Sequence, residues 1–431
     1  MRTFRFVATL CGVVSLALPF HRASGQSTMQ MPTLGLGGGW RLTGMAQAYP
    51  IVTVGAPGDD GSPLRETGWY LTQPALMGHV ESPGQRVVLH STLNFEGLTQ
   101  PDGELTFGGW GEGFLDKRHP HTLVHELMLS MNFWQLAGGS ASISAGKGFA
   151  PYGTSDPMAR PGLKYPTNHH LSQILERWTL NAAWMRGGWS VEAGIFGGQE
   201  PEGAYDFSNI ESFGDSWSAR VARRWGTSAT GPLWEGSVSL GRITQFAHTR
   251  QETTRLTNAA LMRSGPWVGG QLYTLAEASQ SYVAGHQEFF SLLGEARWSG
   301  GGHQPYVRVE YASRPEYARE GAAGDEGYFR YEHEQDPIGA TRWLIATAAY
   351  AFEMTPTPWS VRPFLEVQRH HVRGDGGGIS ASGLFGSSSF WALSFGARVF
   401  VGGEPMRMGS YGILDGVTQV VTAGGGALHV H

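Results

Sequence analysis

The sequence has few long apolar runs, one cysteine and little charge. Only residues 6–20 form an apolar run approaching membrane length. A membrane-spanning helix needs about 20 mostly apolar residues, so a polytopic helical membrane protein is excluded. The one cysteine, Cys11, lies inside that run, and a large closed barrel needs no disulfide framework. Charged residues make up 16% of the chain, below the roughly 25% of soluble domains.

Glycine and aromatic residues are abundant instead. The 431 residues include 63 glycines and 15 tryptophans, and 12% of the chain is aromatic. So many aromatic residues argue against intrinsic disorder, and the absence of a strict Gly-X-Y period excludes collagen. The apolar share is only 41%, which fits strands that are apolar on one face.

The N-terminus has the three parts of a secretory signal. Arg2 and Arg5 supply positive charge, residues 6–20 form the apolar stretch, and residues 23–25 offer small residues for cleavage. We expect residues 1–25 to be removed after Sec export; an uncleaved anchor is the alternative. The full chain has a net charge of −5, and cleavage makes it more acidic, so charge gives no support for nucleic-acid binding.

Polar and apolar residues alternate with a period of two along many segments. In 188–197, for example, Trp189 and Val191 alternate with Ser190 and Glu192. Charges fall on the polar face, while the apolar face has aliphatic centres and aromatic ends. A barrel facing lipid needs this layout, because hydrocarbon requires an apolar band and the interfaces favour aromatic girdles. In lipid every backbone polar group must be paired, so such a sheet must close.

Sixteen segments show this pattern, and counts of 14–18 remain open. The segments are 38–49, 67–80, 85–97, 123–135, 140–147, 171–186, 188–198, 215–225, 233–245, 254–263, 266–279, 285–298, 303–313, 339–354, 358–373 and 388–401. Short connections follow even segments and longer ones follow odd segments, as periplasmic turns and extracellular loops do in outer-membrane barrels.

The sequence therefore predicts an all-β fold, a transmembrane antiparallel up-and-down β-barrel, over residues 38–401. A periplasmic lead (26–37) precedes it, and a Gly-rich tail (402–431) follows Phe400, the aromatic end of the last strand. Within the tail, residues 413–421 are predicted to form either a further strand or a periplasmic helix.

Histidines and acids gather in three long connections, 98–122, 148–170 and 199–214, which neighbour one another at one rim, and at the start of the predicted strand that follows the first of them. The candidate residues are Asp116, His119, His121, His125, Glu126, His169, His170, Glu200, Glu202 and Asp206. Imidazoles and carboxylates bind Zn or Cu, so these groups could converge on a metal. Folded into the lumen, they would form a constriction whose charge changes near neutral pH. The third alternative is hydrogen bonding that locks the loops at the rim.

The polar faces of the strands carry charges of both signs. The candidate lumen-lining residues are Arg86, His90, Glu96, Arg177, Glu192, Arg220, Arg224, Arg308, Glu310, Arg362, Glu366 and Arg398. A barrel of about sixteen strands is wide enough for an aqueous channel, in which charges cost little. An ion-paired interior without a through-path is the alternative.

No catalytic constellation emerges from the sequence. His125-Glu126 lacks the second histidine of H-E-x-x-H and lies in a predicted strand. There is no G-x-S-x-G motif, and Gly146-Lys147 lacks the spacing of a P-loop. We therefore expect no enzyme activity.

Three motifs resemble an uncharacterised bacterial outer-membrane β-barrel family, whose members carry D-[RK]-x-H-P-H, H-H and E-P-[DE] loop motifs in this order. Here they are residues 116–121, 168–170 and 198–207, and the resemblance covers residues 85–220. Thr122 stands where an acid is usual, and Gln199 where arginine is usual. Genes of this family sometimes lie near metal-resistance genes, so the resemblance implies a metal link without a defined activity.

Together these observations predict a porin-like channel of the bacterial outer membrane for small polar solutes or ions. The alternative is a non-conducting barrel that binds Cu or Zn, or a partner, through its loops. Expected partners are outer-membrane lipid, the barrel assembly machinery and, by analogy with trimeric porins, further copies of the chain.

Overall fold

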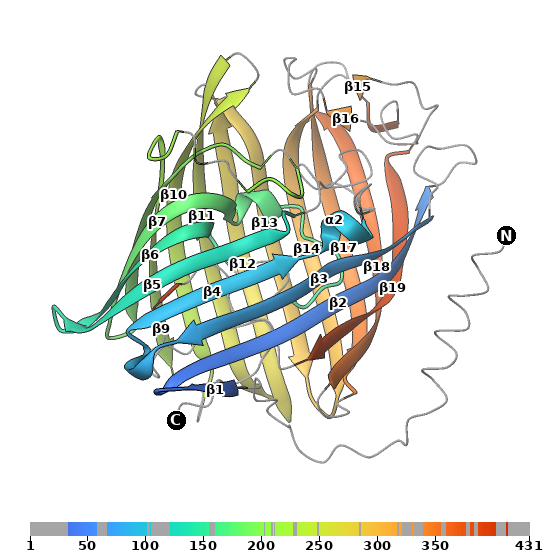
Figure 1. The fold of residues 1–431 in the computed structure, drawn as a ribbon. Coiled ribbons are helices and arrows are strands. Elements are labelled where there is room, and N and C mark those ends of the chain that lie inside the picture. The colour runs from blue at the N-terminus through green and yellow to red at the C-terminus, as the bar shows by residue number, and fades with distance from the viewer. Residues whose placement is uncertain are drawn as a thin grey trace.

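Antiparallel strands form one closed sheet in the computed structural model of the protein (Figure 1). The predicted signal, the lead before residue 33 and all of the tail except residues 411–412 lie outside the described residues. The described residues are 33–57, 67–100, 104, 121–154, 160–201, 203–207, 210, 212–226, 231–247, 250–283, 286–316, 319–320, 330–331, 339–354, 359–375, 380–382, 387–401 and 411–412.

Sixteen strands make the wall of the barrel, as predicted. They are β2 (Trp40–Pro57), β3 (Thr67–Glu81), β4 (Val87–Asn94), β5 (Val124–Leu136), β6 (Gly139–Ala150), β7 (Ile174–Arg186), β8 (Trp189–Phe196), β9 (Ser216–Gly226), β10 (Leu233–Ala247), β11 (Arg250–Trp267), β12 (Gly270–Val283), β13 (His286–Ser299), β14 (His303–Glu316), β17 (Gly339–Phe352), β18 (Trp359–Asp375) and β19 (Ser389–Val401). Each strand pairs with the next, and β19 closes on β2 from Val401↔Ala46 to Phe390↔Pro57.

Small elements complete the described structure. Strand β1 (Thr33–Gly37) pairs with the start of β2, and β15 (Arg319–Glu320) pairs with β16 (Arg330–Tyr331). The short helices are η1 (Pro83–Gln85), α2 (Glu96–Thr99) and η3 (His169–Leu171). Among the described residues, no helix is both long enough and apolar enough to cross a membrane.

Several predicted segment boundaries were wrong, and two of these errors matter most for the ladder. The first segment does not end at residue 49, because β2 continues through Pro50 to Pro57. The predicted turn at 264–265 is also wrong, because the ladder runs on through Gly265↔Leu272 and Pro266↔Gln271. The turn lies at Val268 and Gly269, whose φ angles of 44° and 71° suit the two central residues of a type I′ hairpin.

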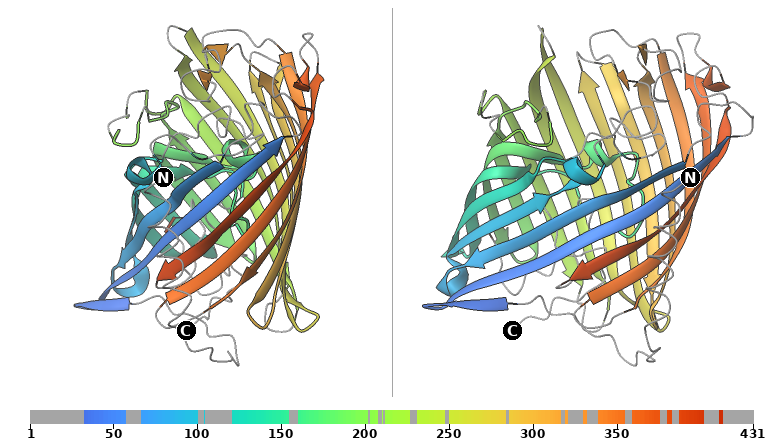
Figure 2. Two further views of the ribbon diagram at one scale, coloured as in Figure 1. Left: turned by 90° about the vertical axis from the view of Figure 1, so that its right-hand side faces the viewer. Right: turned by 45° about the vertical axis from the view of Figure 1, so that its right-hand side comes forward.

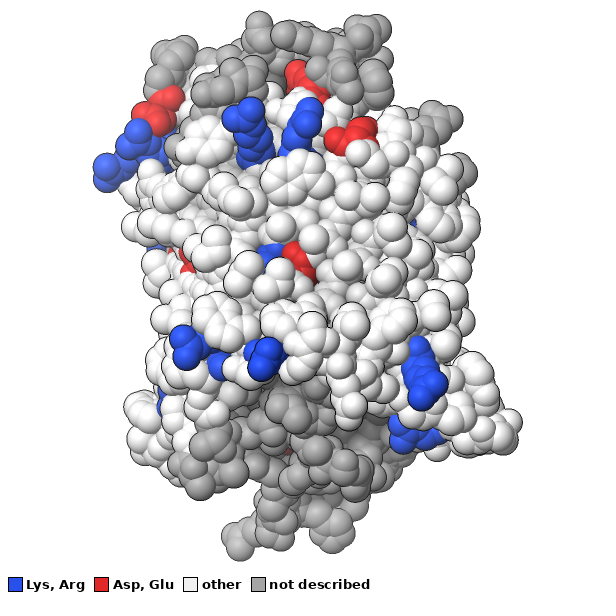
Figure 3. Space-filling model, turned by 90° about the vertical axis from the view of Figure 1, so that its left-hand side faces the viewer, with Lys and Arg blue, Asp and Glu red and all other residues white. Residues whose placement is uncertain are grey.

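The outer surface of the barrel is apolar over a wide belt. Strand β8 alternates strictly between exposed and buried residues, with Trp189 and Val191 outside and Ser190 and Glu192 inside. Figure 3 shows one face of this belt, almost without charge and bounded above and below by charged residues. Val238, on β10, is 58% exposed. A soluble monomer rarely exposes so large an apolar surface, whereas lipid covers it in a transmembrane barrel.

Short turns gather at one end of the barrel and most of the long connections at the other (Figure 2). Strand β1 and the end of β19 lie at the short-turn end, so both described ends of the barrel are on the same side. The connections after β10 and β12 are shorter than predicted, because these strands and their partners extend further, to Ala247 and Val283.

The buried apolar core lies inside the barrel. Tyr152, Leu163 and Leu171, from the connection between β6 and β7, pack in one cluster with wall residues such as Tyr49 and Trp343. That connection therefore contributes to the interior of the barrel.

Candidate functional site

The connection between β6 and β7 folds into the barrel interior. All described residues of 151–154 and 160–173 are buried except His170, which is partly buried. Backbone N–H groups of this connection donate to two wall carboxylates, from Leu163 to Glu366 on β18 (2.9 Å) and from Thr167 to Glu310 on β14 (2.6 Å). The connection thus reaches strands distant from its own along the wall. We name residues 151–173 the inner connection.

Glu277 on β12 is the main anchor of the inner connection. Its carboxylate accepts hydrogen bonds from Thr154 Oγ1 (2.7 Å), Arg160 Nη2 (2.9 Å) and Asn168 Nδ2 (2.7 Å). The sequence prediction missed Glu277, although its neighbours Ala276 and Ala278 on the outward face marked it as an interior acid.

The two cations of the inner connection are neutralised by acids. Burial alone would lower the pKa of Arg160, but the carboxylates of Glu277 and Glu295 outweigh it and hold this pKa above its ordinary value. Lys164 Nζ lies 2.6 Å from Glu104 Oε1 and also donates to Tyr70. Each of the two cations therefore has a carboxylate beside it inside the barrel.

Most of the predicted lumen-lining charges face the interior and are paired there. Arg220 contacts Glu192 (2.7 Å) and Glu235 (2.6 Å), and Arg224 contacts Glu235 (2.6 Å). The other contacts are Arg308 with Glu310 (2.7 Å), Arg177 with Glu200 (2.6 Å), Arg362 with Glu353 (3.0 Å), and Arg398 Nη1 with the carbonyl oxygen of Arg160 (2.6 Å). Arg220 and Arg308 are each 1% exposed. The charges of the described interior are therefore largely ion-paired.

Three predicted lumen residues are placed differently from the rest. Arg86 is exposed beside the short turn, because β4 begins only at Val87. Glu96 lies beyond the end of β4, in the first position of α2, where its buried carboxylate accepts from the backbone N–H of Gln73 (2.8 Å). His90 is partly buried, and its ring lies 5.7 Å from that of Tyr411.

Three residues from two segments meet inside the wall: His121 and His125 lie on one segment, and Glu176 is on β7. Glu176 Oε1 lies 2.5 Å from His125 Nδ1 and 3.4 Å from His121 Nδ1. It also accepts the backbone N–H of Thr122 at 2.9 Å. All three side chains are buried, and one candidate ligand atom from each lies within 4.8 Å of the other two. We name these three residues the His-Glu cluster.

Backbone irregularities bring the cluster together. Thr92 pairs with Glu126 while Leu93 pairs with Val124, so His125 is the extra residue of a β-bulge. In a regular strand its parity would match that of Leu127 and Leu129, which face outward.

Glu176 also has the parity of an outward residue, Leu180. It has a φ of 58°, in the left-handed region, and its side chain is buried. The sequence prediction missed Glu176. The sequence did contain one sign that the strand is irregular there, namely an acidic residue at a position that should face lipid.

The other predicted site residues lie near the cluster or apart from it. The ring of His169 lies 5.9 Å from that of His121, and that of His170 lies 5.0 Å from His169. The carbonyl oxygen of Asp206 accepts from Lys147 Nζ (3.0 Å), and Glu200 is exposed. Asp116, His119 and Glu202 lie outside the described residues.

Part of the C-terminal tail also lies against the interior wall. Tyr411 OH donates to Glu126 (2.5 Å) and accepts from the backbone N–H of Phe149 (2.9 Å). Its carbonyl oxygen accepts from Ser142 Oγ at 3.0 Å. The chain therefore returns from the end of β19 to β5 and β6. The predicted strand or helix at 413–421 lies outside the described residues.

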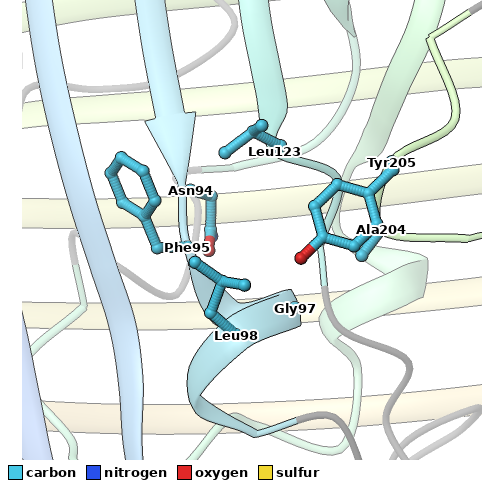
Figure 4. A pocket seen from close by; sticks show the side chains of 7 residues that line it. All are labelled: Asn94, Phe95, Gly97, Leu98, Leu123, Ala204 and Tyr205. Carbon is cyan, nitrogen blue, oxygen red and sulfur yellow. The ribbon is translucent and has the colours of Figure 1, made fainter.

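A small pocket beside α2 has no charged side chain in its lining. Figure 4 shows the lining residues, which are Asn94, Phe95, Gly97, Leu98, Leu123, Ala204 and Tyr205. The backbone N–H of Leu123 donates to the carbonyl oxygen of Ala204 at 2.7 Å. The pocket is thus a small gap where α2 packs against the connection after β8.

Comparisons with known proteins find similarity only among solved structures. No protein-family model matches the chain. No curated protein matches it either, so the family resemblance stays a prediction. Similar structures include OmpT of Vibrio cholerae (9% identity, TM-score 0.49, 86% of this chain and 100% of that one), OprB of Pseudomonas putida (9%, 0.49, 84% and 94%) and the channel DcaP of Acinetobacter baumannii (10%, 0.49, 85% and 99%). At this identity and these TM-scores, the likeness says nothing about what this chain does.

Proposed function

We propose that the protein is a bacterial outer-membrane channel of restricted conductance for small polar solutes or ions. One observation carries the proposal: the inner connection lies inside the barrel and is bonded to β12, β14 and β18. A sixteen-stranded wall is wide enough for an aqueous channel, and a segment folded into it narrows the passage.

The interior chemistry supports polar rather than apolar solutes. Carboxylates and guanidinium groups line the described inner wall, and they attract ions while an apolar solute gains nothing from them. The outer apolar belt supports placement in the outer membrane, with its lipid and the barrel assembly machinery as partners. Assembly with further copies remains a prediction from analogy. We assign no catalytic role.

The second candidate function is a barrel that does not conduct. The close ion pairing of the described interior favours it, because charges that bind one another are less available to a passing ion.

Planar-bilayer recording separates the two candidates. We expect small discrete conductance steps from the wild type and larger steps from Glu277→Ala, because loss of this anchor loosens the inner connection. Asp375→Ala is the matched control, since Asp375 pairs with Arg342 at the exposed end of β17 and β18. Folded wild type and Glu277→Ala that both stay at the background of lipid alone would establish the non-conducting barrel.

A further inference from the structure

The His-Glu cluster includes strand positions that are unusual for buried polar residues in a barrel wall. Two of its members stand at strand positions that would ordinarily face lipid, and both are buried. A bulge turns His125 inward, and a left-handed backbone does the same for Glu176. Such irregularities persist where the surrounding structure holds them, and they concentrate at functional sites.

The three side chains have the chemistry of a metal site. Two imidazoles and one carboxylate form the donor set of many zinc sites that keep a position open for a further ligand. Calcium and magnesium prefer sets made only of oxygen, so nitrogen donors select a transition metal. Two of the donor residues lie four apart on one segment, and the third is on β7.

The distances suit a small ion after a modest rearrangement. In a tetrahedral site with bonds of about 2.0–2.2 Å, neighbouring ligand atoms lie about 3.3–3.6 Å apart. His121 Nδ1 and Glu176 Oε1 are already 3.4 Å apart. His125 Nδ1 is 2.5 Å from the same oxygen, a hydrogen-bond distance, so the ion would take the place of the proton they share.

The surroundings support binding rather than simple packing. Both ring nitrogens of His121, Nδ1 and Nε2, are buried, and neither makes a hydrogen bond within the described part of the chain. Buried polar atoms are ordinarily hydrogen-bonded, so an exception calls for a partner. The ring of His169 lies 5.9 Å from that of His121, which makes His169 a candidate for a fourth ligand.

We propose that His121, His125 and Glu176 bind one borderline divalent transition-metal ion, with Zn²⁺ as its representative, inside the barrel wall. The site is independent of conduction, since a channel or a closed barrel could equally contain it. It differs from the predicted metal site, because the ion would lie inside the wall instead of being held by loops at the rim, and Glu176 was not among the predicted ligands.

Zinc competition against a chromogenic chelator tests the proposal on the folded, full-length protein in detergent. His429 and His431 are both replaced by alanine in every sample, so that the tail cannot contribute. We expect one Zn²⁺ per chain, and about tenfold or greater weakening in His121→Gln and in Glu176→Gln. His303→Gln is the matched control, since His303 is exposed and bonded to Tyr350, and its affinity should equal that of the background protein.

Cobalt absorption provides a second readout that does not depend on the variants. Bound Co²⁺ should show the intense visible bands of tetrahedral coordination, and Zn²⁺ should remove them. No binding by the background protein, a weak octahedral cobalt spectrum, or equal affinity in folded His121→Gln and Glu176→Gln would each overturn the proposal. Heat-modifiable gel mobility verifies that each variant is folded.

Discussion

The two halves of the barrel wall differ in how regularly their strands pair. We name β2 to β7 the irregular half and β9 to β19 the regular half. From β2 to β7, four of the five strand pairs contain a register shift, at Gln47/Tyr49, Thr92/Leu93, Phe133/Leu136 and Gly148/Ala150. From β9 to β19, the pairs run residue for residue except for one shift near the end of β12 and the start of β13.

Each half has its own relation to the interior. The regular half presents carboxylates such as Glu277, Glu310 and Glu366 at ordinary inward positions, where they hold the inner connection. The irregular half redirects His125 and Glu176 from outward positions into a buried cluster. Regular strand pairing therefore positions the carboxylates that hold the inner connection, whereas the register shifts position the residues of the His-Glu cluster.

The variant with the largest expected effect tests whether water is excluded from the charged groups inside the regular half. Arg220→Met leaves Glu192 and Glu235 buried without their shared cation, and we expect the free energy of unfolding to fall by about 3–5 kcal/mol. Urea unfolding in lipid vesicles measures the loss. Arg342→Met, which breaks the exposed pair with Asp375, should show no measurable loss. An equally small loss for Arg220→Met would mean that water screens the interior charges.

A second change tests the lipid-facing belt of the same half. Val238 on β10 is 58% exposed, and Val238→Arg places a charge in the belt. We expect a loss of about 2–4 kcal/mol near the bilayer midplane, measured by the same unfolding assay. Val238→Leu should be neutral. If Val238→Arg is neutral too, this part of the belt does not face hydrocarbon.

A third comparison addresses the irregular half through its backbone. Glu176→Gly and Glu176→Ala remove the same carboxylate, but only glycine adopts a φ of 58° without strain. We expect the glycine variant to be more stable than the alanine variant by about 1 kcal/mol. At Glu192, in regular β8, the order should reverse, because glycine weakens a regular strand. The same order at both positions would contradict the assigned left-handed backbone.

The variant with the smallest expected effect tests whether a nearby positive charge weakens metal binding at the proposed site. Lys147 Nζ donates to Thr122 Oγ1 (2.8 Å), and Thr122 in turn donates its N–H to Glu176. Lys147→Met removes a cation close to the site, so Zn²⁺ affinity should rise a few-fold at low salt. An unchanged affinity in the chelator competition would mean that the ion binds too far from Lys147 to be affected by its charge.

Much of the fold could be predicted because lipid imposes a period of two on every strand. The errors arose where local signals conflict with the ladder. Pro50 and Gly265-Pro266 resemble breaks, yet β2 and β11 continue through them. The true turn at Val268 and Gly269 carries a valine in a left-handed conformation, which residue preferences do not suggest.

The candidate site was only partly predictable. His121, His125 and His169 were identified as candidates, either at the rim or at a constriction in the lumen, and the structure buries all three. Glu176 and Glu277 were missed, because their roles depend on contacts between segments far apart in the chain. A histidine and an acid at lipid-facing parity were the one local sign of the cluster.

The proposed function depends on the inner connection lying across the lumen, and cysteine cross-linking measures that position. The backbone N–H of Leu163 bonds to Glu366 on β18, so a thiol cross-linker should join Leu163→Cys to Glu366→Cys in membrane-embedded protein lacking Cys11. Val309→Cys with Ala346→Cys, neighbours on β14 and β17, is the positive control. Efficient cross-linking of both pairs is the predicted result. Cross-linking of the control pair alone would show that the inner connection does not cross the lumen.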